Sequence, residues 1–445
     1  MANFQNSVGV KVPNVLLPNK NVDMQKWAVV ACDQYTSQPD YWEQTERNVG
    51  EAPSTLRLML PEMYLEKPGE AERIESINEH MRRYMQEGVL EEKGEGLVFV
   101  RRTVDGKTRN GLIVALDLEA YDYKKGATTL IRATEGTIVE RIPPRLRIRK
   151  DAPLELPHIL VLIDDPSRTV IEPLANALSD GEKLYDFELM QKGGHIEGYL
   201  FRNEKHILAA LHALEALCDP AAFSAKYGAD KAPMLFAMGD GNHSFATAKA
   251  NWERCKETLS EEEKLDHPAR FCLVELENVH DAGIVFEPIH RVLFDADGAK
   301  EALQALLEAQ NGGCRVEHFP SREALAAFTA RGESGAHILP FVSKDGFYAY
   351  VVSSPAAQLA VGTLQNAVDA YLKENKKASV DYIHGDDVVF ELGAKQGNLG
   401  FLLPPMQKSE LFRTVVFDGA LPRKTFSMGE AHEKRYYLEC RKIMK

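Results

Sequence analysis

The sequence predicts a mixed α+β protein with a main domain over residues 1–294 and a smaller α+β subdomain over residues 295–445. Three observations lead to this prediction. The chain has 445 residues, more than one typical domain holds. Its residues are 44% hydrophobic and 27% charged, which is an ordinary globular balance. Short apolar runs typical of strands alternate with amphipathic segments typical of helices, without an internal repeat.

The first 120 residues contain the clearest periodic patterns. Residues 27–32 form an apolar run that predicts a buried strand, and Asp33 follows it directly. Asp33 is therefore either a catalytic carboxylate at the end of the strand or the N-cap of the next helix. Residues 70–87 carry apolar side chains at helical spacing. Asp105 and Gly106 lie between two apolar runs, and this pair predicts a β-hairpin.

A basic segment follows at residues 131–150, with five arginines and one lysine in an otherwise acidic protein. A planar guanidinium pairs bidentately with phosphate oxygens, so the segment is a candidate phosphate clamp; a solvated basic surface is the alternative. Pro143 and Pro144 argue against a regular helix across its middle. The candidate ligands here are Arg132, Arg141, Arg145 and Arg147.

Two further polar sites interrupt apolar stretches. Residues 184–189 and 197–201 flank a double glycine, which predicts a hairpin whose tip carries Lys192 and His195. His290 and Arg291 break into a buried-looking strand near the expected domain boundary. Each pair is either a set of ligand contacts or part of an ordinary surface. Between the two pairs, residues 204–218 carry apolar side chains at helical spacing, which predicts an amphipathic helix.

The central motif is Met-Gly-Asp-Gly-Asn-His-Ser at residues 238–244, between an apolar strand and a helix. A helix start offers unpaired N–H groups and the positive end of a dipole, and glycines let an anion approach. The spacing is neither that of a Walker loop nor that of a Rossmann fingerprint. The candidate ligand contacts are Gly239, Asp240, Gly241, Asn242 and Ser244, with His243 as a catalytic candidate.

Composition narrows the classes of partner. The formal net charge is −13, from 66 acidic and 53 basic residues, which disfavours nonspecific binding to nucleic acid or anionic membrane. No run approaches the roughly 20 apolar residues of a membrane span, and the start of the chain does not read as a signal peptide. The six cysteines lack CxxC spacing, so we expect reduced thiols in a cytoplasmic protein; the oligomeric state stays open.

Five segments together carry a family resemblance over nearly the whole length: residues 31–35, 134–149, 240–244, 288–291 and 421–425. The chain resembles the bacterial and archaeal family known as domain of unknown function 1015. The central box of that family is commonly Asp-Gly-His-His-Arg and is similar to the phosphate-binding box of the ParB/sulfiredoxin superfamily, which includes free-serine kinases. The resemblance implies a ParB/sulfiredoxin-like core. Here Asn242 and Ser244 replace a His and the Arg, so an arginine from the basic segment is expected to supply the missing charge.

These observations favour a small-molecule phosphotransferase acting on a free hydroxyl amino acid such as serine, or the reverse phosphoserine phosphatase. Asp33 or Glu135 would take the hydroxyl proton, and His243 would contact phosphate or donate a proton. The donor would be ATP, ADP or pyrophosphate, and Mg²⁺ is a possible cofactor with Asp240 as its ligand. The alternatives are a nucleotide-dependent DNA clamp, against which the acidic balance argues, and a phospholigand sensor without turnover.

Overall fold

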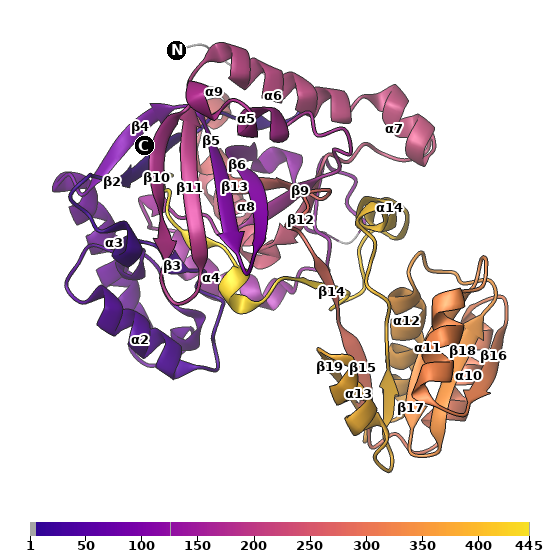
Figure 1. Ribbon diagram of the computed structural model, residues 1–445. Helices are drawn as coiled ribbons and strands as arrows, with labels where there is room; N and C mark the ends of the chain where they lie inside the picture. Colours follow the sequence, from indigo (N-terminus) through magenta and orange to yellow (C-terminus); the bar gives the residue numbers. More distant parts are fainter. Residues whose placement is uncertain (1–5, 125, 445) are drawn as a thin grey trace. The chain divides into compact units, whose positions relative to one another are not determined.

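The computed structural model describes residues 6–124 and 126–444 and divides into two compact units (Figure 1). Unit 1 is Met1–Val285 together with Met428–Lys445, and unit 2 is Phe286–Ser427. The predicted mixed α+β class is confirmed. The boundary differs from the expected residue 295, because the second unit begins at Phe286 and one strand of its sheet, residues 290–294, lies before that point. The end of the chain also differs, because its last strands pair within unit 1.

A nine-stranded sheet forms the centre of unit 1. The hairpin at Asp105 and Gly106 is confirmed: both residues have positive φ, as a tight two-residue turn requires. The second predicted hairpin, with its tip at Lys192, is also present. The strands run in the order β10 (Glu182–Leu189), β11 (Gly194–Phe201), β5 (Leu97–Val104), β6 (Lys107–Asp117), β13 (Phe271–Asn278), β9 (Leu160–Ile163), β12 (Phe236–Asp240) and β7 (Ile131–Arg132), and β1 (Val10–Lys11) also pairs with β6.

Different elements cover the two faces of this sheet (Figure 1). The apolar stripes of α6 (Glu204–Leu217) and α8 (Asn242–Lys256) pack on one face, as the periodicity of the former predicted. On the other face lie α2 (Pro39–Val49), β3 (Val29–Val30) and β22 (Tyr436–Tyr437). The predicted helix α3 (Glu70–Gln86) packs on a separate small core. The sheet is therefore the middle of three layers.

Short elements complete unit 1. The expectation that Pro143 and Pro144 exclude a helix is wrong, because both lie in the first turn of α4 (Ile142–Arg149), where a missing N–H costs no intrahelical bond. Among the described residues, the remaining helices and strands of unit 1 are α1 (Met24–Trp27), β2 (Asn14–Pro18), β4 (Leu90–Glu95), β8 (Leu154–Glu155), α5 (Glu172–Ala175), α7 (Pro220–Tyr227), α9 (Glu261–Asp266) and β23 (Arg441–Lys442). Short 3₁₀ turns lie between them.

Buried ion pairs fix the returning segment 428–445 to the sheet. The guanidinium of Arg435 lies 2.8 Å from Glu275 on β13 and 2.6 Å from Glu439, and all three side chains are almost fully buried. Tyr185 on β10 donates a hydrogen bond to Glu439 at 2.5 Å. These contacts hold β22 against the central sheet.

Unit 2 has its own antiparallel sheet, as the alternation of its sequence predicted. Its strand order is β16 (Cys314–Phe319), β18 (Gly346–Val352), β17 (His337–Ser343), β20 (Leu399–Phe401), β15 (His290–Phe294) and β19 (Ser379–Ile383). Its helices are α10 (Ala299–Gln310), α11 (Arg322–Arg331), α12 (Ala360–Glu374), α13 (Asp386–Gly393) and α14 (Lys408–Asp418), and β14 (Phe286–Pro288) pairs with β21 (Phe426–Met428).

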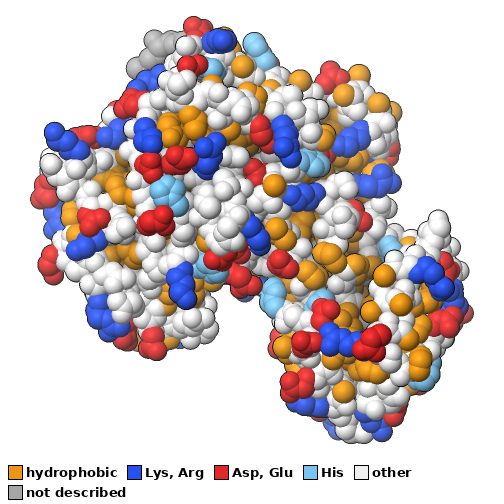
Figure 2. Space-filling model, viewed as in Figure 1, with side chains coloured by type: hydrophobic (Ala, Val, Ile, Leu, Met, Phe, Trp, Pro, Cys, Tyr) orange, Lys and Arg blue, Asp and Glu red, His pale blue; other side chains and the backbone are white. Residues whose placement is uncertain are grey.

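The surface carries charges of both signs. Figure 2 shows lysine and arginine interspersed with aspartate and glutamate over the visible face of each unit. Within residues 6–124 and 126–444, no single helix has the length and apolar composition of a membrane span; α6 and α7 reach both only as a pair, across a bend of 41°.

Candidate functional site

The site is built around the junction between β12 and α8. Gly241 has φ of +80°, and a Cβ there would lie 3.1 Å from the Cα of Ile159, so glycine suits the position on both grounds. The helix starts at Asn242, and within the described chain no side chain caps its first turn. The N–H groups of that turn are therefore left without a capping side chain and could bind an anion.

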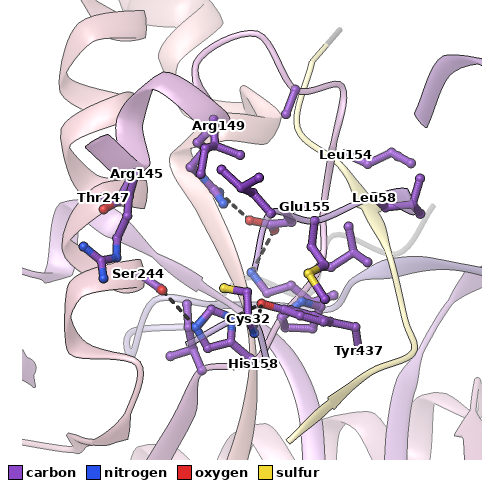
Figure 3. A pocket seen from close by; sticks show the side chains of 18 of the residues that line it. Cys32, Leu58, Arg145, Arg149, Leu154, Glu155, His158, Ser244, Thr247 and Tyr437 are labelled. Atoms are coloured by element: carbon purple, nitrogen blue, oxygen red, sulfur yellow. Dashed lines mark hydrogen bonds and ion pairs between the residues drawn. The ribbon is translucent and has the colours of Figure 1, made fainter. Parts of the chain in front are cut away.

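Three side chains from distant parts of unit 1 form a chain of hydrogen bonds beside this junction (Figure 3). Ser244 Oγ lies 2.9 Å from His158 Nε2. His158 Nδ1 lies 2.8 Å from the hydroxyl of Tyr437, which also accepts from the backbone N–H of Cys32 at 3.3 Å. The chain links α8, the segment before β9, the C-terminal β22 and the end of β3.

These groups line a cavity of about 140 Å³. Its walls carry both polar and aliphatic side chains. Figure 3 shows Ser244 and His158 directed toward each other at this cavity. The polar and thiol groups are Cys32, Glu62, Arg145, Arg149, Glu155, His158, Ser244, Thr247, Cys272 and Tyr437, and the aliphatic ones include Leu58, Met59, Leu60, Leu65 and Met81.

His243 is held as a neutral imidazole. Burial, and then the positive charges of Arg141 and Arg145, lower its pKa to about 4, while the carboxylate of Asp33 opposes them. Its Nε2 accepts a hydrogen bond from the backbone N–H of Ile138 at 3.3 Å. With Nε2 occupied in this way, the proton of the neutral ring resides on Nδ1.

The carboxylate of Asp240 already has partners within the protein. Burial alone would raise the pKa of this carboxyl, but Lys434 at 3.0 Å and the N–H of Gly241 at 2.9 Å stabilise the charged form, so the pKa lies below its usual range. Among the described residues, no group of three or more His, Cys, Asp or Glu side chains is arranged to hold a metal ion. A Mg²⁺ ion at this carboxylate would have to displace Lys434, and the role of Asp240 as a Mg²⁺ ligand stays a prediction.

The structure divides the predicted arginines into two groups. Arg141 and Arg145 act on His243, and Arg145 also reaches Glu62 and the carbonyl of residue 141. Arg147 instead pairs with Glu70 at 2.8 Å on the surface. The buried guanidinium of Arg132 donates to the carbonyls of residues 129, 232 and 233. The last two arginines stabilise local structure.

The other predicted residues lie in three places. Thr134 donates to the carbonyl of Met238 at 2.6 Å, so the segment that carries half-buried Glu135 runs beside the end of β12. Lys192 is exposed at its hairpin tip. His195 pairs with two carboxylates of the same hairpin, at 2.9 and 3.0 Å, so the hairpin contacts belong to the sheet and not to the α8 junction.

His290 and Arg291 belong to unit 2 and are buried there. His290 accepts from the N–H of Leu403 at 3.0 Å and lies 2.9 Å from Asp386. Arg291 is bound by Gln365 and by the carbonyls of residues 289 and 423. Both side chains therefore stabilise the second sheet and its neighbours.

Sequence reasoning missed His158, Tyr437 and Lys434. His158 stands in a loop before an apolar strand, and the other two lie more than 190 residues beyond Asp240. No spacing rule connects them to the central motif, because only the tertiary fold brings them together. Their one common signal is a polar side chain beside a short apolar run.

The chain is weakly similar to several solved structures. No curated protein matches the sequence. A free serine kinase in complex with AMP is 10% identical over 74% of this chain and 92% of its own, with a TM-score of 0.37. A conserved hypothetical protein from Pyrococcus furiosus is 10% identical over 73% and 90%, with a TM-score of 0.33. SbnI from Staphylococcus aureus, with a C-terminal truncation, is 12% identical over 71% and 82%, with a TM-score of 0.34.

The relation to the ParB/sulfiredoxin superfamily stays a prediction. The family resemblance is confirmed, because the family model described as "Protein of unknown function (DUF1015)" matches residues 16–371. The chain belongs to this family.

Proposed function

We propose that unit 1 is a small-molecule phosphotransferase that acts on a free hydroxyl amino acid such as serine. One observation carries the proposal. His243 lies in the uncapped first turn of α8, and its imidazole is influenced by the cations Arg141 and Arg145 and by the carboxylate of Asp33. An anion site and a candidate base therefore adjoin each other.

Phosphoryl transfer needs this combination. The transition state spreads negative charge over the oxygens of the transferred group, so catalysis depends on positioning and charge neutralisation. The N–H groups of residues 242–244 would bind those oxygens from one side. Arg141 and Arg145 would bind them from another, replacing the arginine that Ser244 displaces from the common family box.

His243 would donate rather than accept. Since Nε2 accepts from Ile138 and the ring is neutral near pH 7, Nδ1–H is the group left to donate to a phosphate oxygen. Asp33, or Glu135 in the adjacent segment, would take the proton of the acceptor hydroxyl. The roles of base and donor are thus divided between two sides of the helix start.

The size of the cavity supports a small acceptor. Sites for drug-sized ligands commonly occupy about 300–1,000 Å³, whereas this cavity has about 140 Å³. A free amino acid is a ligand of that scale. The phosphoryl donor, whether ATP, ADP or pyrophosphate, would place its terminal phosphate at α8, where Arg141, Arg145 and the helix start supply positive charge. Arg145 would exchange its present partner Glu62 for a phosphate oxygen.

Phosphorus NMR tests the proposal directly. Wild type would be incubated with ATP, ADP or pyrophosphate and a panel of hydroxyl amino acids, and with phosphoserine for the reverse reaction. We expect a new phosphomonoester or released phosphate, reduced by about 10²–10⁴-fold in Asp33→Asn. His212→Gln, at an exposed position on α6, is the control and should match wild type.

Three results would contradict the proposal. The proposal would be contradicted if neither wild type nor His243→Ala transferred phosphate with any of the donors. Donor binding detected by thermal shift, without any product, would identify a phospholigand sensor. Salt-sensitive retention of duplex DNA would identify a DNA-binding protein.

A further inference from the structure

We propose that Ser244 is a nucleophile activated by His158, and that the transferred phosphoryl group passes through a covalent bond to Ser244 Oγ. The identity of the transferred group rests on the proposed function. The pairing of Ser244 with His158 rests on geometry alone, so the two ideas can fail separately.

The direction of the Ser244 side chain is the first support. Ser244 lies in the first turn of α8, where the Cβ of each residue is tilted toward the N-terminal end of the helix. A serine or threonine hydroxyl within a helix commonly donates a hydrogen bond to the carbonyl four residues earlier, as Thr247 does to the carbonyl of His243 at 2.7 Å. Ser244 instead bonds across to His158 at 2.9 Å, within the range of a nucleophile and its base.

His158 is held in the orientation that a base requires. The hydroxyl oxygen of Tyr437 accepts from the N–H of Cys32 and can accept the Nδ1 proton of His158 at 2.8 Å. Burial holds the pKa of Tyr437 well above its usual range, so it stays a neutral phenol. With its proton on Nδ1, the ring presents the lone pair of Nε2 to the Ser244 hydroxyl. Tyr437 is therefore a positioning residue.

An electrophile can reach this pair. Ser244, His158 and Tyr437 all line the cavity of about 140 Å³, and Arg145 lines it as well (Figure 3). A phosphorus atom bound at the start of α8 would have Ser244 Oγ on one side and a guanidinium beside its oxygens. The nucleophile, its base, the orienting phenol and one guanidinium thus line the same cavity.

The chemistry balances as a double displacement. Ser244 Oγ attacks phosphorus, the bond from phosphorus to the donor oxygen breaks, and the Ser244 proton moves to His158 Nε2 and then to the leaving oxygen. The acceptor hydroxyl next attacks the phosphoserine and gives its proton to the carboxylate of Asp33 or Glu135, from which the proton passes to His158. The Oγ–P bond breaks, and that proton returns to Ser244.

Labelling with diisopropyl fluorophosphate tests the nucleophile without requiring knowledge of the natural donor. Attack by Ser244 would form an Oγ–P bond and release fluoride, with the proton taken by His158. We expect peptide mass spectrometry to find the adduct on Ser244. Ser244→Ala should abolish it, and Ser179→Ala, at an exposed serine, should leave the rate unchanged.

The roles of the two partners are separated by the size of their effects on the labelling rate. His158→Gln should slow labelling by about 10²–10⁴-fold, because it removes the base. Tyr437→Phe should lower the rate by less, because Nε2 of His158 remains available to accept the Ser244 proton. Circular dichroism and thermal unfolding of each variant establish that it is folded, and Ser244→Thr provides a conservative replacement.

Each outcome decides a separate question. Absence of the adduct from Ser244 in wild type, or an equal rate in folded His158→Gln, would overturn the nucleophile. Phosphoryl transfer at the wild-type rate in Ser244→Ala would overturn the covalent intermediate and leave the proposed function standing. Specific labelling of Ser244 without any phosphoryl transfer would support the nucleophile and count against the proposed function.

Discussion

The titration of His243 tests the charge arrangement at the start of α8. Burial first, and then Arg141 and Arg145, lower its pKa from the ordinary value of 6.5 to about 4. The folded pKa therefore lies below the unfolded one, and the unfolded state binds this proton more readily. The stabilisation is fully present above pH 6.5 and is lost as the pH falls through the window toward 4.

The size of the effect follows from the same shift. One pKa unit corresponds to about 1.4 kcal/mol, so the full difference amounts to about 3 kcal/mol. The ring is only partly buried, and solvent screening reduces this to about 1–2 kcal/mol. Wild type should lose that much more stability than His243→Gln between pH 7 and about pH 4.5.

Urea unfolding at the two pH values gives the difference in free energy, and proton NMR of the imidazole gives the pKa itself. His212→Gln removes an exposed histidine and should retain the wild-type dependence on pH. Arg141→Gln combined with Arg145→Gln should raise the pKa of His243. Titration of His243 at or above pH 6.5 would refute both the assigned burial and the assigned cations.

Three further predictions concern stability. Gly241→Ala should cost about 1–3 kcal/mol more than Gly69→Ala in thermal unfolding, because both residues have φ near +80° but only at position 241 would the new Cβ meet a neighbour; an equal cost would contradict the contact. Arg435→Met should destabilise by about 3–5 kcal/mol in urea, because it leaves two buried carboxylates without their cation; a change under about 1 kcal/mol would contradict this. Arg132→Met should cost about 1–3 kcal/mol through unpaired carbonyls, yet leave phosphate affinity, measured by calorimetry, unchanged.

Local chemistry determined the elements that could be predicted. Glycines between an apolar strand and a helix located the junction at Gly241, and helical periodicity located α3 and α6. The turn at Asp105 followed from the need for positive φ. In each case the decisive interactions lie within a few residues of sequence.

The rest depends on contacts between distant residues. His158 and Tyr437 are 279 positions apart, and neither has a neighbour that marks it as part of a site. The roles of the arginines were equally hidden: Arg132 and Arg145 have the same chemistry, but one is surrounded by carbonyls and the other faces a cavity. The sequence shows which side chains are charged, whereas the fold determines which groups they pair with.

The return of segment 428–445 to unit 1 has a consequence for the order in which the protein is made. Translation delivers β13, then all of unit 2, and only afterwards Lys434 and Tyr437. The nascent chain therefore holds an unfinished sheet face, without the Arg435 ion pairs, until residues 428–445 leave the ribosome. A truncated message, or a protease that cuts after residue 427, would yield a chain that keeps every strand of the second sheet but lacks Lys434, Arg435 and Tyr437 in unit 1.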